Sequence, residues 1–73
     1  MNMTEVQEAF VRVLISLRKE LNLAEEDILG ITVMCCTEAA MEEMVLYIEE
    51  EYEKGTLTRN KLVAKVHDII EGE

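Results

Sequence analysis

The sequence predicts an all-α fold, a small four-helix bundle. Apolar residues recur at helical spacing along the whole chain, which contains no proline and only three glycines. No two segments alternate as paired strands would. With 73 residues, 49% of them hydrophobic, the chain forms a single domain over residues 1–73. We expect helices over about 4–21, 24–36, 38–54 and 58–71.

The first helix, about 4–21, has recognisable start and stop signals. Thr4 is a good N-cap, and Gln7 three residues later completes a capping box. Asn22 tolerates the left-handed conformation that ends helices. Its core stripe is Val6, Phe10, Val13, Leu14, Leu17 and Leu21.

The second helix, about 24–36, starts with acidic residues and is then apolar almost all round. Ala24 is a weak cap, but Glu25, Glu26 and Asp27 suit the positive end of the helix dipole. The stretch "ILGITVMCC" carries no charge, so we expect burial on several sides. Its β-branched residues would also suit a strand, but the chain offers no partner strand.

The last two helices, about 38–54 and 58–71, begin after threonine caps. Thr37 and Thr58 are the caps, and Gly55 is a good C-terminal stop. The stripe of the third helix is Met41, Met44, Val45, Ile48 and Tyr52, and that of the fourth is Leu62, Val63, Val66, Ile69 and Ile70.

The adjacent cysteines invite comparison with a metal or redox site. Zinc needs about four ligands, and only His67 could join the two thiols. We interpret Cys35 as a core residue and expect Cys36 to pack on Met41 as a hydrophobic staple. Neighbouring cysteines make a poor disulfide, which favours a reducing, cytoplasmic setting.

No catalytic constellation is recognisable. "EEEYE" at 49–53 lies within a helix and not in a calcium loop, and His67 has no nucleophile at a readable spacing. A glycine-rich phosphate loop is also missing. We therefore expect no enzyme activity, no cofactor and no metal site.

The segment "TEAAMEEMVLYIEEEY" resembles the second helix of acyl carrier proteins. In that family the helix opens with Asp-Ser-Leu, and the serine carries phosphopantetheine. Glu38 stands at the serine position, preceded by Thr37 and followed by Ala39. The resemblance covers sixteen residues and implies no carrier function, because the attachment residue is replaced.

The charge is strongly negative and unevenly distributed. The formal net charge is −9, which disfavours direct binding to nucleic acid or to anionic membranes. Residues 20–53 contain eleven acids and no Lys or Arg. A short basic segment follows, with Lys54, Arg59, Lys61 and Lys65. The longest apolar run is too short to span a membrane.

Helical angles place apolar residues on outer faces, where a partner could bind. Leu46 lies amid an acidic face with Tyr47 at its flank, and Ile15 and Val11 lie outside the core stripe of the first helix. The predicted partner-binding residues are Leu46, Tyr47, Glu42, Glu43, Glu49, Glu50, Val11 and Ile15.

These features predict a small acidic, non-catalytic protein–protein interaction module, and two partner types fit. In a homodimer, the basic segment of one copy would face the acidic helix of its neighbour. Alternatively, the chain is an acidic inhibitor or antitoxin-like protein that masks a basic, nucleic-acid-binding partner.

Overall fold

The computed structural model describes residues 3–72, which are helical with short links and contain no strand. The predicted all-α bundle is therefore confirmed. None of the described helices is both long and apolar enough to cross a membrane. The helices are α1 (Met3–Ser16), α2 (Arg18–Leu21), α3 (Glu25–Met34), α4 (Glu38–Lys54) and α5 (Arg59–Gly72).

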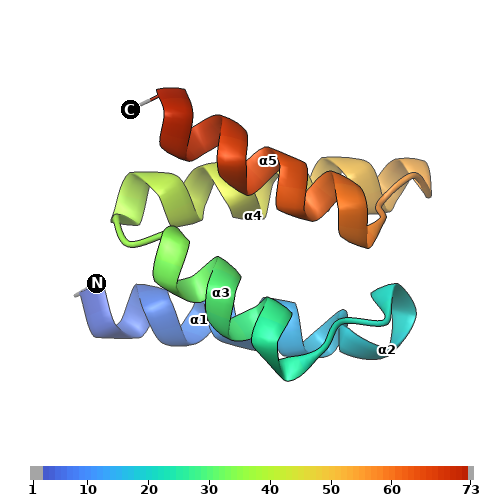
Figure 1. Cartoon of the computed structure of the whole chain (residues 1–73), viewed down its shortest axis with the longest axis horizontal. Coiled ribbons are helices and arrows are strands. Elements are labelled where there is room, and N and C mark those ends of the chain that lie inside the picture. Colours follow the sequence, from blue (N-terminus) through green and yellow to red (C-terminus); the bar gives the residue numbers. More distant parts are fainter. Residues whose placement is uncertain (1–2, 73) are drawn as a thin grey trace.

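The four long helices form two layers (Figure 1). α1 and α4 make the rear layer, while α3 and α5 lie in front of them. α1 contacts α3 and α4, and α5 also contacts α3 and α4, so that each long helix packs on two others. One face of every helix therefore has no neighbour within the described chain.

The expected helix over 4–21 is interrupted at Leu17. The Ser16 hydroxyl donates a hydrogen bond to the Val13 carbonyl (2.7 Å). The Leu17 N–H is shared between the carbonyls of Val13 and Leu14, at 3.2 Å each. Such local bonds compete with the regular helical ladder and tighten the turn. α2 then runs for one turn and ends at Asn22, whose φ of 55° is left-handed as predicted.

The predicted caps of α4 and α5 are confirmed. The Thr37 hydroxyl accepts a hydrogen bond from the Ala40 N–H (3.1 Å), and the Thr58 hydroxyl accepts one from the Lys61 N–H (3.2 Å). Gly55 ends α4 with a φ of 72°, where a side chain would be strained.

Two predicted boundaries differ from the structure. Thr4 lies inside α1 and does not cap it, a shift of the size by which helix ends commonly vary. α3 ends at Met34, two residues early, because Cys35 leaves the helix with ψ of 72°. The turn allows Thr37 to adopt the extended conformation that caps α4.

The core lies where the four long helices meet, and it is aliphatic apart from Phe10 and sulfur-containing residues. Cys35 is fully buried, as predicted. Cys36 is exposed, so its interpretation as a packed residue is wrong. The buried residues are Phe10, Leu14, Leu17, Leu23, Ile28, Ile31, Cys35, Ala40, Met41, Met44, Ile48, Leu62, Val66 and Ile69.

Three expectations about burial are wrong. α3 packs mainly on α1 and α5 and is not buried on several sides, since Leu29 and Val33 are 65% and 74% exposed. Tyr52 is exposed, and its hydroxyl donates a hydrogen bond to Glu20 (3.2 Å). Ile70 is also exposed, at the far end of α5.

Candidate protein-binding groove between α1 and α4

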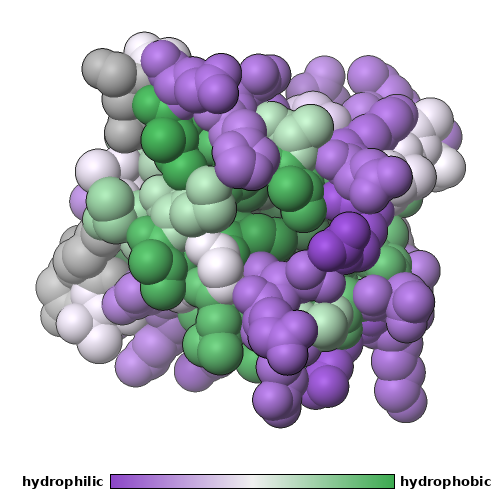
Figure 2. All heavy atoms as spheres, viewed as in Figure 1, coloured by the Kyte–Doolittle hydropathy of each residue, from purple (hydrophilic) through white to green (hydrophobic). Residues whose placement is uncertain are grey.

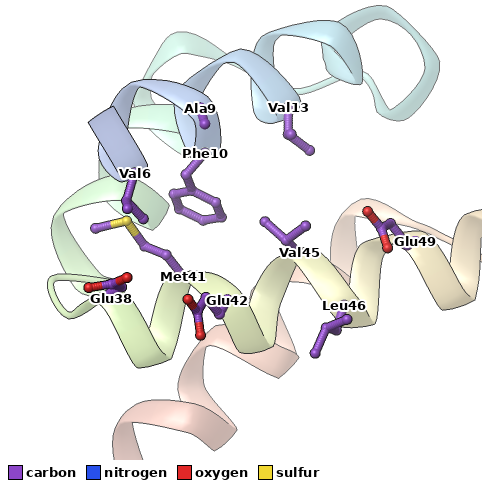
Figure 3. A pocket seen from close by; sticks show the side chains of 10 residues that line it. All are labelled: Val6, Ala9, Phe10, Val13, Glu38, Met41, Glu42, Val45, Leu46 and Glu49. Carbon is purple, nitrogen blue, oxygen red and sulfur yellow. The ribbon is translucent and has the colours of Figure 1, made fainter. Parts of the chain in front are cut away.

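A groove of about 580 Å³ lies between α1 and α4. Phe10 and Met41 are buried at its floor, and Val6, Val13 and Val45 are half-buried above them. These apolar side chains point toward one another between the two helices, while Leu46 points away from α1 on the outer side of α4 (Figure 3). The lining residues are Val6, Ala9, Phe10, Val13, Glu38, Met41, Glu42, Val45, Leu46 and Glu49.

Three carboxylates border this apolar groove. Glu38, Glu42 and Glu49 lie four and seven residues apart on α4, so they share one face of the helix. All three are exposed. Among residues 3–72, no basic side chain lines the groove or forms an ion pair with these glutamates. The groove therefore combines an apolar floor with an uncompensated acidic border.

The cations of the basic segment pair with acids elsewhere in the same chain. Lys54 and Lys61 approach Glu51, with Nζ–oxygen distances of 3.8 and 3.4 Å. Lys65 lies 3.6 Å from Glu43, and its Nζ lies 5.3 Å from the centre of the Tyr47 ring, within cation–π range. These contacts use the basic segment within the chain, so that in the described part of the structure its cations do not pair with the groove carboxylates.

Arg59 and Asp27 form the best-defined ion pair and connect α5 to α3. The Arg59 Nε and Nη2 donate to the two Asp27 carboxylate oxygens at 2.9 and 2.7 Å. The Ala24 N–H also donates to Asp27 (2.9 Å). The hydrogen bond from Arg59, followed by that from Ala24, lowers the pKa of Asp27 from 3.8 to about 2. Asp27 thus both caps α3 and anchors α5.

Glu51, near the C-terminal end of α4, is also held by a hydrogen bond and a charged contact. The Thr56 hydroxyl donates a hydrogen bond to it (3.0 Å), and Lys61 adds a charged contact. The hydroxyl bond, then the Lys61 bond, lowers the pKa of Glu51 from its ordinary value. This carboxylate stabilises the link between α4 and α5 and does not line the groove.

The eight predicted partner-binding residues do not form one surface. Leu46, Glu42 and Glu49 line the groove. Glu43 and Tyr47 face α5 through Lys65. The remaining three lie elsewhere: Glu50 is 4.0 Å from Lys54, Val11 lines a second hollow between α1 and α3, and Ile15 is 55% exposed on α1.

The three valines above the groove floor were expected in the core. Val6, Val13 and Val45 were predicted as parts of core stripes, and each is only half-buried. The sequence feature that could have indicated the groove is the width of the apolar stripe of α1, because α3 and α4 together do not cover it. Leu46 was recognised because it stands alone in an acidic helix face.

No group of three His, Cys, Asp or Glu side chains within residues 3–72 is arranged to hold a metal ion.

Comparisons with protein-family models, curated proteins and solved structures find no match to this chain.

Proposed function

We propose that this chain is a non-catalytic protein–protein interaction module whose α1–α4 groove binds a basic amphipathic helix of a partner protein. The observation that carries the proposal is the apolar groove bordered by three carboxylates that have no ion-pair partner among residues 3–72. Cys35 and Cys36 are neighbours and therefore make a poor disulfide, which suits a reducing, cytoplasmic compartment.

The dimensions of the groove match a short helix. The border from Glu38 to Glu49 spans eleven residue steps along α4, or roughly 16 Å at 1.5 Å per residue. A partner helix of about three turns covers that length. Its apolar residues at i, i+3 or i+4, and i+7 would contact the valines, as in other helix-in-groove complexes.

The acidic border favours a partner helix with positive charge. Binding an acidic or neutral helix would leave the groove carboxylates partly desolvated and without cations. Lysines or arginines flanking the apolar residues would instead pair with Glu42 and Glu49 at the edge of the complex. Such pairs add modest affinity but raise the association rate and exclude acidic competitors.

A synthetic peptide tests the proposal directly. The probe is an amphipathic helix of about 14 residues with leucines at groove spacing and lysines on both flanks. We expect binding by fluorescence anisotropy, with NMR shifts on Val6, Val13 and Val45. A scrambled peptide of equal composition should not bind. If neither peptide binds below about 1 mM, the proposed function is wrong.

Two variants separate the acidic border from net charge. Changing Glu42 and Glu49 together to Gln should weaken peptide binding roughly 2- to 30-fold, because exposed ion pairs contribute about 0.2–1 kcal/mol each. The matched control changes Glu25 and Glu26 to Gln and alters the net charge equally. That control should stay within about twofold of wild type, since neither residue lines the groove.

An apolar variant tests the outer edge of the groove. Leu46→Glu should leave the fold intact, because Leu46 is 65% exposed, and should weaken association. Unchanged binding by this variant would exclude Leu46 from the contact.

The same carboxylates support a second candidate function, an acidic inhibitor that covers a basic nucleic-acid-binding surface. Salt distinguishes the two functions. Helix binding should persist in about 1 M salt, losing no more affinity than the Glu42 and Glu49 double variant does, because the apolar contacts are not screened. A complex that is lost at high salt, and that nucleic acid displaces at low salt, would favour the inhibitor.

A further inference from the structure

A second apolar surface lies on the opposite layer of the molecule, over α3 and the adjoining part of α5 (Figure 2). We call it the α3 patch, and it consists of Leu29, Gly30, Val33 and Met34 with Ile70 of α5. Four of the seven large hydrophobic side chains exposed in the described residues belong to it. Val33 is 74% exposed and Leu29 65%, whereas the other three, Ile15, Leu46 and Tyr52, lie on other helices. Large apolar patches of this kind indicate contact with another molecule.

The patch differs from the rest of the surface in its charge. No ionisable acid or base other than a thiol occurs from Ile28 to Cys36, in a chain of net charge −9. Two copies that met through α4 would bring carboxylates together, because its outer face contains Glu42, Glu49 and Glu53. The α3 patch is a face on which two such acidic molecules can approach without that repulsion.

Gly30 gives an independent indication of close helix contact. It lies in the middle of α3, where glycine is less favourable than alanine. Its φ is not positive, since Gly55 is the only glycine with positive φ in the described residues. A Cβ added at Gly30 would meet no atom within 4 Å. Neither backbone conformation nor packing within the chain therefore requires glycine at this exposed position. The absence of a side chain would let a second helix cross closely there.

We propose that the α3 patch is the interface of a homodimer in which α3 crosses α3 of a second copy, with the two-fold axis close to Gly30. A two-fold axis makes the interface self-complementary, so one patch serves both copies. It also places Glu25 and Glu26 of the two copies at opposite ends of the crossing, away from each other. This arrangement keeps the acidic residues of the two copies apart and places the close helix crossing at Gly30.

The required area explains why α5 contributes. A standard interface buries about 800 Å² on each partner, roughly a sixth of the 4913 Å² surface of this chain. The outer face of a ten-residue helix is smaller than that. Ile70 of α5 adds exposed apolar surface beyond that face. This dimer also differs from one that pairs the basic segment with a neighbouring α4, because those cations are engaged within the chain.

Sedimentation equilibrium over a wide concentration range tests the dimer. We expect the wild-type chain to associate to twice its monomer mass, and Val33→Glu to remain monomeric with an unchanged helical circular dichroism spectrum. Ile15→Glu is the matched control, since it places the same charge at another exposed site on α1 and should dimerise like wild type. Gly30→Ala should weaken dimerisation at least tenfold while raising the melting temperature of the monomer.

Three results would overturn the proposal: a wild-type chain that stays monomeric at about 1 mM, a Val33→Glu variant that dimerises like wild type, or a Gly30→Ala variant that dimerises undiminished. The groove proposal is tested separately. Leu46→Glu should weaken peptide binding and keep the dimer, while Val33→Glu should lose the dimer and keep peptide binding. Each surface can therefore fail without the other.

Discussion

Two leucines, Leu62 and Leu46, allow the contribution of burial to be measured with one substitution at two sites. Leu62 of α5 is 0% exposed and belongs to the core, whereas Leu46 of α4 is 65% exposed. Changing either to Ala removes the same atoms from a helical residue. The intrinsic helix preferences of Leu and Ala therefore cancel between the variants. The difference in their free energies of unfolding reports burial and cavity formation alone.

The expected magnitudes are far apart. Leu62→Ala should lower the free energy of unfolding by about 3–5 kcal/mol, the loss of transfer energy plus a cavity. Leu46→Ala should change it by less than about 0.5 kcal/mol. For a chain of 73 residues, the whole stability is about 4–11 kcal/mol at typical values per residue. Leu62→Ala therefore removes a large share of it.

Urea and thermal unfolding followed by circular dichroism at 222 nm, at a concentration where the chain is monomeric, measure both effects. A loss of about 3 kcal/mol corresponds to a fall of roughly 12–24 °C in the melting temperature for a domain of this size. Leu46→Ala should unfold within about 4 °C of wild type. Equal losses for the two variants would refute the packing described for α4 and α5.

Two further predictions concern acid stability and thiol reactivity. Because Asp27 has a folded pKa of about 2, below its ordinary 3.8, it stabilises the fold at pH values above about 4. The difference in stability between wild type and Asp27→Asn should shrink as the pH falls from 4 to 2. The difference between wild type and Arg59→Gln should shrink in the same way. Urea midpoints of variant and wild type that stay equally far apart over this pH range would contradict the prediction. Cys36 should react with a thiol reagent at once, while Cys35, fully buried, should react only through opening of the structure. The single variants Cys35→Ser and Cys36→Ser assign the two phases, and equal rates would show that Cys35 is accessible.

The fold class and most helix ends could be predicted because their signals are local. Thr37 caps α4 through its own hydroxyl, and Gly55 supplies the left-handed residue at the other end. The break at Leu17 could not be predicted. The Ser16 hydroxyl can bond either to the Val13 carbonyl or to water, and the sequence does not decide between the two. The exposed face of α3 depends on how many neighbours the helix has, which is a property of the whole bundle.

The candidate site was predicted only in part, for the same reason. Leu46, Glu42 and Glu49 follow from the angles of a single helix and do line the groove. The opposite wall, from Val6 to Val13, forms a groove only when α1 and α4 are placed side by side. Likewise, the sequence shows an acidic middle and a basic segment, but only the packing of α5 on α4 shows that Lys65 and Glu43 meet within one chain.

In the proposed complex with a partner helix, the methionine at the groove floor affects selectivity. Met41 is 1% exposed and has an unbranched, flexible side chain, whereas the valines around it are stiff. A thioether can change rotamer to fit apolar side chains of different shapes, so the floor can accept leucine, isoleucine or phenylalanine from an incoming helix. Discrimination among ligands then depends on the carboxylates at the edge. A groove of this composition would be tolerant of side-chain shape and strict about charge, which suits a module that recognises several related partners.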